Sequence, residues 1–160
     1  MSEAVPVHGR SKNLVLAAMI FAVAMTFIDQ TIVSIAVPEI QNKLGLSATG
    51  VQWAVNAYLL ALASLFAFGG RLADTLGHRK MVTVGVIIFA GASALCGATP
   101  TGSLAEAWLI AFRALQGLGG AIMFPAALAI VVQTFELRSR GRALALFFEI
   151  GRASCRERVW

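Results

Sequence analysis

Gly69-Gly70-Arg71-Leu72-Ala73-Asp74-Thr75-Leu76-Gly77-His78-Arg79-Lys80 is a polar stretch that separates two long uncharged runs. Residues 51–70 carry no charge over 20 positions, and residues 81–99 carry none over 19. A helix needs roughly 20 apolar residues to cross a hydrocarbon core about 30 Å thick. We therefore expect residues 69–80 to form a short, basic, glycine-containing hairpin between two membrane spans.

The composition is that of a membrane protein, because 58% of the residues are hydrophobic and only 13% are charged. The net charge of +5 does not indicate a nucleic-acid partner, since the basic residues lie in the gaps between apolar runs and not on one solvated face. The two cysteines and two histidines lack the spacing of a metal site, and no phosphate-binding loop of the Walker type is present. The sequence therefore predicts neither an enzyme nor a cofactor or metal site.

The sequence predicts an all-α, polytopic membrane bundle with about four spans and a truncated fifth. A cytoplasmic tail (residues 1–13) precedes the spans, which we place at residues 14–37, 51–70, 81–99, 108–135 and, cut short, 143–148. Eight basic residues fall on the side of the N-terminus, and Lys43 alone falls on the other side. The positive-inside rule then puts the N-terminus in the cytoplasm, in a cell (plasma or inner) membrane.

Residues 149–160 do not continue the fifth span, because they contain three arginines and two glutamates. Each charge at the bilayer centre costs about 2.5–3.5 kcal/mol on insertion scales. The peptide also resembles the translated read-through of a sequencing-library adapter. We interpret it as a non-native tail, with the C-terminal remainder of the protein missing; a genuine short protein with a basic amphipathic end is the alternative.

Two ionisable residues lie inside predicted spans. Asp29 in the first span would mark an ion pathway, since carboxylates at membrane depth face a bundle interior or a wet cavity; a structural aspartate near the headgroups is the alternative. Arg113 in the fourth span stays charged, and it can hold a nearby carboxylate in its charged form, bind an anionic group or extend to the interface. Gln116 lies one turn further along.

Small residues and a proline suggest where helices approach closely or bend. Ala90, Ala94 and Ala98 form a stripe of four-residue spacing in the third span, for which generic membrane packing is the favoured explanation. The fourth span contains four helix-breaking residues, which we expect to allow close packing or bending: Gly117, Gly119, Gly120 and Pro125.

The hairpin carries its own pattern of charge. We expect Asp74 near the N-terminus of a helical turn or of the third span, where helix amides favour an anion. Arg79 and Lys80 would hold the loop at the anionic inner leaflet. A plain positive-inside loop is the alternative interpretation.

These segments resemble motifs of the major facilitator superfamily. Residues 70–80 resemble its signature loop between spans two and three, Gly-x-Leu-Ala-Asp-Arg-x-Gly-Arg-Lys, with Thr75 and His78 where arginine is commoner. Residues 29–38 are similar to the span-one motif of drug:proton antiporters predicted to have fourteen spans, and residues 51–60 to the start of their second span. Residues 113–120 resemble the span-four motif linked to proton coupling.

The resemblance covers roughly residues 14–148 and implies the N-terminal fragment of a transporter of the multidrug efflux type. Its activity would be antiport of protons against small lipophilic or cationic compounds, with the proton gradient as the energy source. Asp29, Arg113 and Gln116 would be the proton-coupling candidates. The cytoplasmic gate motif would comprise Gly70, Asp74, Gly77, His78, Arg79 and Lys80. A carrier of sugars, amino acids or siderophores, or a truncated non-functional membrane fragment, remains the alternative.

Overall fold

The computed structural model describes residues 9–102, 104–134, 141 and 145. Four helices form the described fold: α1 (Gly9–Leu44), α2 (Ala48–Leu76), α3 (His78–Gly97) and α4 (Ala105–Thr134). Each contains a stretch long and apolar enough to cross a membrane. The expected all-α membrane fold is therefore confirmed. The truncated fifth span, apart from residue 145, and the tail at residues 149–160 lie outside the described residues.

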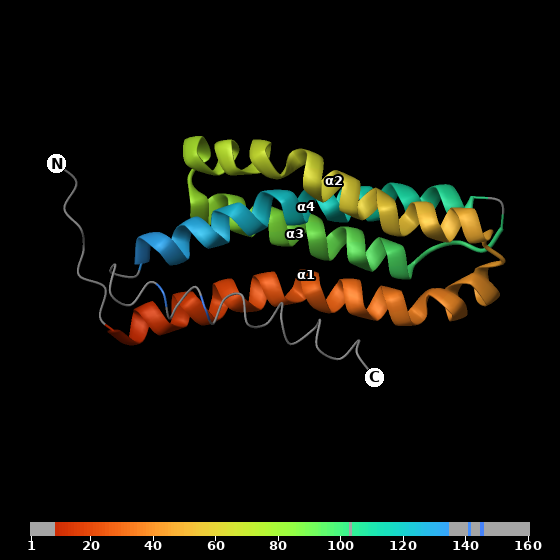
Figure 1. Ribbon diagram of the computed structural model, residues 1–160, viewed down its shortest axis with the longest axis horizontal. Coiled ribbons are helices and arrows are strands. Elements are labelled where there is room, and N and C mark those ends of the chain that lie inside the picture. Colours follow the sequence, from red (N-terminus) through yellow and green to blue (C-terminus); the bar gives the residue numbers. More distant parts are fainter. Residues whose placement is uncertain (1–8, 103, 135–140, 142–144, 146–160) are drawn as a thin grey trace.

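The four helices lie side by side along the long axis of the molecule, as Figure 1 shows. The hairpin between α2 and α3 is at one end, and the α1–α2 and α3–α4 connections are at the other. We call these the hairpin end and the opposite end. The central helix is α4, which packs extensively on both α2 and α3, whereas α1 makes a smaller contact, mainly with α4.

Two apolar clusters hold the helices together. The larger one joins residues of all four helices, mainly of α1, α3 and α4, and includes Val23, Met81 and Met123, none more than 7% exposed. The smaller one lies at the opposite end and joins Val51 and Ala54 of α2 to Leu109 of α4. Many large apolar side chains of α1 and α2 remain exposed, as expected for helices that face lipid or further protein.

Glycines let α4 approach its neighbours backbone to backbone. A Cβ atom built on Gly117 would overlap the main chain of α2 at Tyr58, and one on Gly119 would lie 2.7 Å from the backbone nitrogen of Phe89 in α3. Gly120 faces the Leu62 side chain. Helix α4 continues through Pro125, whose Cβ lies 3.7 Å from the Cβ position of Gly70.

The alanine stripe expected on α3 does not form a contact between the described helices. Ala90, Ala94 and Ala98 are exposed, and α3 instead turns Gly85 and Phe89 toward α4. A stripe of small residues shows only that close approach is sterically allowed, so it does not decide which face of a helix is used.

The α2–α3 hairpin is tighter than expected, and this corrects the prediction for Asp74. Only Gly77 separates the two helices, with a φ of +98° that L-residues rarely adopt. Asp74 therefore lies in the last turn of α2, and not near a helix N-terminus. The reason is that nothing interrupts α2 before Gly77, whose N–H donates to the Ala73 carbonyl.

Candidate functional site

Asp29, Arg113 and Gln116 form a closed hydrogen-bonded network between α1 and α4. Arg113 Nη1 donates to Asp29 Oδ2 at 2.7 Å and to Gln116 Oε1 at 2.8 Å. Gln116 Nε2 donates to Asp29 Oδ1 at 2.8 Å. The Arg113 side chain is 3% exposed and that of Asp29 14%. The structure thus brings together all three predicted coupling residues around one nearly buried ion pair.

Helix geometry on α4 explains how the cationic half of this network is held. Arg113 and Gln116 are three residues apart, so they share one face of the helix. Tyr58 of α2, only 1% exposed, covers the guanidinium, with Arg113 Cζ 4.8 Å from its ring centroid. A cation in this position is attracted by the ring face. The Arg113 side chain therefore lies in the interior of the bundle. This excludes the alternative in which its guanidinium extends to the membrane–water interface.

Donors outnumber acceptors in this network. Arg113 Nη1 donates two hydrogen bonds. Within the described part of the chain, Arg113 Nε and Nη2 have no hydrogen-bond partner, and Gln30 Nε2 has none either. Unpaired donors at such depth are costly. The Nε–Nη2 edge is a side of a guanidinium that can bind a planar acceptor group in a bidentate manner.

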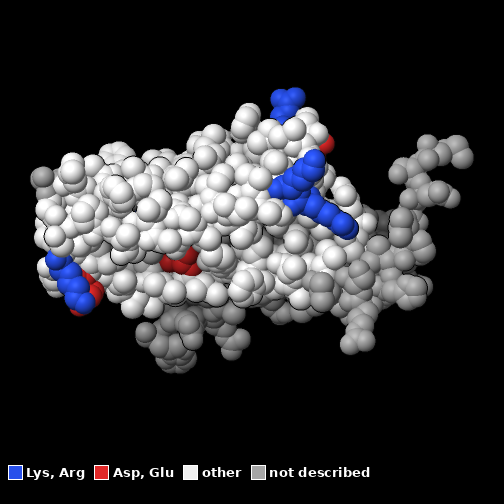
Figure 2. All heavy atoms as spheres, turned by 180° about the vertical axis from the view of Figure 1, so that it is seen from behind, with Lys and Arg blue, Asp and Glu red and all other residues white. Residues whose placement is uncertain are grey.

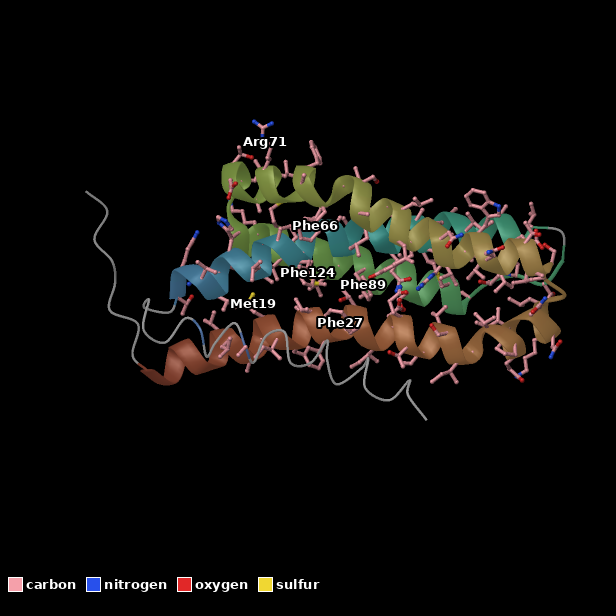
Figure 3. The ribbon with its side chains drawn as sticks, viewed as in Figure 1. Met19, Phe27, Phe66, Arg71, Phe89 and Phe124 are labelled. Carbon is pink, nitrogen blue, oxygen red and sulfur yellow. The ribbon has the colours of Figure 1, made fainter. Side chains whose placement is uncertain are left out.

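An aromatic cluster follows the network toward the hairpin end. Phe124 of α4 lies between Phe27 of α1 and Phe66 of α2, as Figure 3 shows, with ring centroids 6.4 and 5.8 Å away. Because Phe27 is two residues from Asp29, apolar rings border the ion pair on this side.

The gate-motif residues lie at the hairpin end, away from the ion pair. Asp74 is 16 residues beyond Tyr58 along α2, which corresponds to about 24 Å of helix. Its Oδ1 lies 3.2 Å from His78 Nε2, an ion pair only when the histidine is protonated. Arg79 and Lys80 are exposed in the first turn of α3, and Figure 2 shows basic atoms gathered at this end.

The sequence interpretation missed two residues that make contacts between helices. Tyr58 is the only tyrosine of the chain and lies in an apolar run, which was a signal for a buried polar role. Glu106 contacts the start of α2 across the opposite end, where its carboxylate accepts the Ser47 N–H. Its isolated acidic position just before a span gave little indication of that partner.

Among the described residues, no group of His, Cys, Asp and Glu could hold a metal ion.

Four apolar helices around a buried ion pair define a multi-pass membrane protein. Residues 19–148 match the family model described as Major Facilitator Superfamily. The chain therefore belongs to the major facilitator superfamily, a family of membrane transporters.

Several curated relatives support this assignment. The chain is 41% identical over 133 residues to the puromycin resistance protein pur8 of Streptomyces alboniger, covering 82% of this chain and 26% of that protein. It is 42% identical to the tetracenomycin C resistance and export protein of Streptomyces glaucescens, covering 87% and 25%. It is 38% identical to the multidrug transporter protein MdtP of Bacillus subtilis, covering 85% and 24%. The chain thus spans about a quarter of the length of these relatives.

Proposed function

We propose that this chain is the N-terminal part of a proton-coupled exporter of small lipophilic or cationic compounds. Relatives named for antibiotic resistance and export support the direction of transport. The exporter would act in the cell membrane with its N-terminus in the cytoplasm, would use the proton gradient and no cofactor, and would have no catalytic activity.

The observation that carries the proposal is the Asp29–Arg113–Gln116 network. A proton-coupled antiporter needs a group that gains and loses a proton in a place where the change of charge alters packing. Protonation of Asp29 would remove its negative charge and so weaken its contact with Arg113. The two residues lie on different helices, so this step would loosen α1 from α4. The proton and the exported compound would then alternate in their effect on the bundle.

The hairpin end would supply the conformational gate. Gly77 forms a one-residue turn, and Asp74 is exposed beside it in the last turn of α2, where the remainder of a full-length carrier could contact it. Arg79 and Lys80 would keep this turn at the anionic inner leaflet. Carriers of this architecture rock two bundles around a central site, so a rigid turn here would act on that movement.

The coupling role is tested by Asp29→Asn in a carrier of the relatives' full length, reconstituted in vesicles with an imposed pH gradient. We expect export driven by the gradient to be lost, since asparagine cannot carry the proton. Glu39→Gln is the matched control, because Glu39 is on the same helix but pairs with Lys43 at 3.0 Å on the surface. Gradient-driven export that survives in Asp29→Asn would rule out the coupling role.

The gate role is tested by Asp74→Asn in the same carrier, with Thr75→Ala as the control on the same exposed turn. We expect altered transport kinetics and altered labelling of cysteines placed along the central pathway. Unchanged kinetics together with unchanged labelling would count against the gate.

A further inference from the structure

Glu106 makes a contact that links the starts of α4 and α2. Its Oε1 accepts the backbone N–H of Ser47 at 2.6 Å. Ser47 is the N-cap residue of α2, and its Oγ accepts the N–H of Gly50 at 2.9 Å. The Glu106 carboxyl group occupies the space that a Cβ on Gly50 would need. The three residues therefore form one interlocked contact, which we call the outer clasp.

The charges of the outer clasp are complementary. A helix N-terminus carries partial positive charge, and carboxylates stabilise it. Helix α2 has no acidic residue in its own first turn, so α4 provides the anion that α2 lacks. Glycine at position 50 leaves room for this contact, since a Cβ there would displace the Glu106 carboxylate, the far end of a flexible side chain.

The outer clasp is the first of a series of contacts along two parallel helices. Contacts between α2 and α4 occur in the same order along both: Gly50 with Glu106, Tyr58 with Arg113, and Gly69 with Ala121. Glu106 and Arg113 are seven residues apart, close to two helical turns, so both face α2. Buried Ala54 and Leu109 belong to the apolar cluster at this end of the helices. No described contact of this series lies further toward the opposite end than the outer clasp.

We propose that Glu106 is a positioning residue, whose contact with Ser47 and Gly50 fixes the axial register of α4 on α2 and thereby holds Arg113 against Tyr58 and Asp29. A slide of α4 by one residue would move Arg113 by about 1.5 Å along the helix axis, which would lengthen and misalign its 2.7 Å contact with Asp29. The proposal adds a residue to the proposed coupling site, and only its consequence for transport rests on that function.

The test uses the 160-residue chain in lipid nanodiscs, with ¹⁵N-labelled arginine observed by NMR. The Nη hydrogens of an arginine give separate signals when hydrogen bonds restrain the guanidinium, so the Arg113 signals report its contacts with Asp29 and Gln116. We expect these signals to collapse in Glu106→Ala and in Gly50→Ala. Glu106→Gln, which keeps an acceptor oxygen, should preserve them in part. Gly91→Ala is the matched control, since Gly91 also lies inside a helix but faces open space.

A second signal separates lost register from general unfolding. Phe89 of α3 packs on Gly119 of α4, on the side of α4 away from the outer clasp. We expect its ring signals to persist in both variants. Unchanged Arg113 signals in Glu106→Ala and Gly50→Ala would overturn the proposal, and so would joint loss of the Arg113 and Phe89 signals. Transport by a full-length carrier that survived loss of the Arg113 signals would instead contradict the proposed coupling function and leave the positioning role intact.

Discussion

The ion pair between Asp29 and Arg113 predicts strong energetic coupling between two residues that are 84 positions apart. Removing one partner of a buried ion pair leaves an uncompensated charge, at a typical cost of 3–5 kcal/mol. Asp29 is 14% exposed, so water screens the pair slightly and favours the lower end of this range. We expect Asp29→Asn and Arg113→Gln each to destabilise the chain by about 3 kcal/mol.

The double variant is the decisive measurement, because it leaves neither charge behind. We expect it to be no less stable than either single variant, which corresponds to a coupling energy of at least about 3 kcal/mol. Reversible unfolding in mixed micelles or by steric trapping measures all four corners of the cycle. The control cycle uses Glu39→Gln and Lys43→Gln, whose side chains are 68% and 74% exposed, with an expected coupling of about 0.3–0.5 kcal/mol. A coupling between Asp29 and Arg113 as small as this surface value would refute the reasoning.

Three further substitutions test the packing with the same unfolding assay. Gly119→Ala places a Cβ 2.7 Å from the Phe89 nitrogen and 2.9 Å from the Gly85 oxygen, so we expect a loss of about 1–3 kcal/mol; stability equal to that of Gly91→Ala would contradict the close approach of α3 and α4. Gly77→Ala forces an L-residue to a φ of +98°, which should cost about 1–3 kcal/mol, and an unchanged stability would show that the turn adopts another conformation. Trp108→Phe removes the 2.9 Å hydrogen bond from Nε1 to the Leu95 carbonyl and should cost about 1 kcal/mol; no loss would mean that this bond contributes nothing net.

The helices could be predicted from the sequence because membrane spans are uncharged and long. Their ends could not, because hydropathy marks where apolar residues stop and not where a helix ends. The first span was expected to finish at residue 37, yet α1 continues through Pro38 to Leu44. Ile40 and Leu44 pack against the apolar cluster at the opposite end, and this burial extends the helix past the apolar run. Conversely, Asp74 was assigned to the wrong helix terminus because a one-residue turn leaves no loop for it.

The candidate site was predictable residue by residue, but its contacts were not. Asp29 and Arg113 were noticeable because charges at membrane depth are rare. Whether they meet depends on how α1 packs on α4, which no local pattern encodes. Tyr58 and Glu106 escaped notice for the same reason, since each acts on a residue of another helix far away in sequence.

The two residues of the ion pair lie on helices that differ in how extensively they contact their neighbours. Arg113 is on α4, which glycines bring into backbone contact with both α2 and α3, and Tyr58 covers its guanidinium. Asp29 is on α1, which has the smaller contact with the other described helices and many exposed apolar side chains. Among the described helices, a change in the charge of Asp29 would therefore displace α1 more readily than α4. Under the proposed coupling, Arg113 would therefore stay in place, and α1, which carries Asp29, would be the helix that responds to a proton.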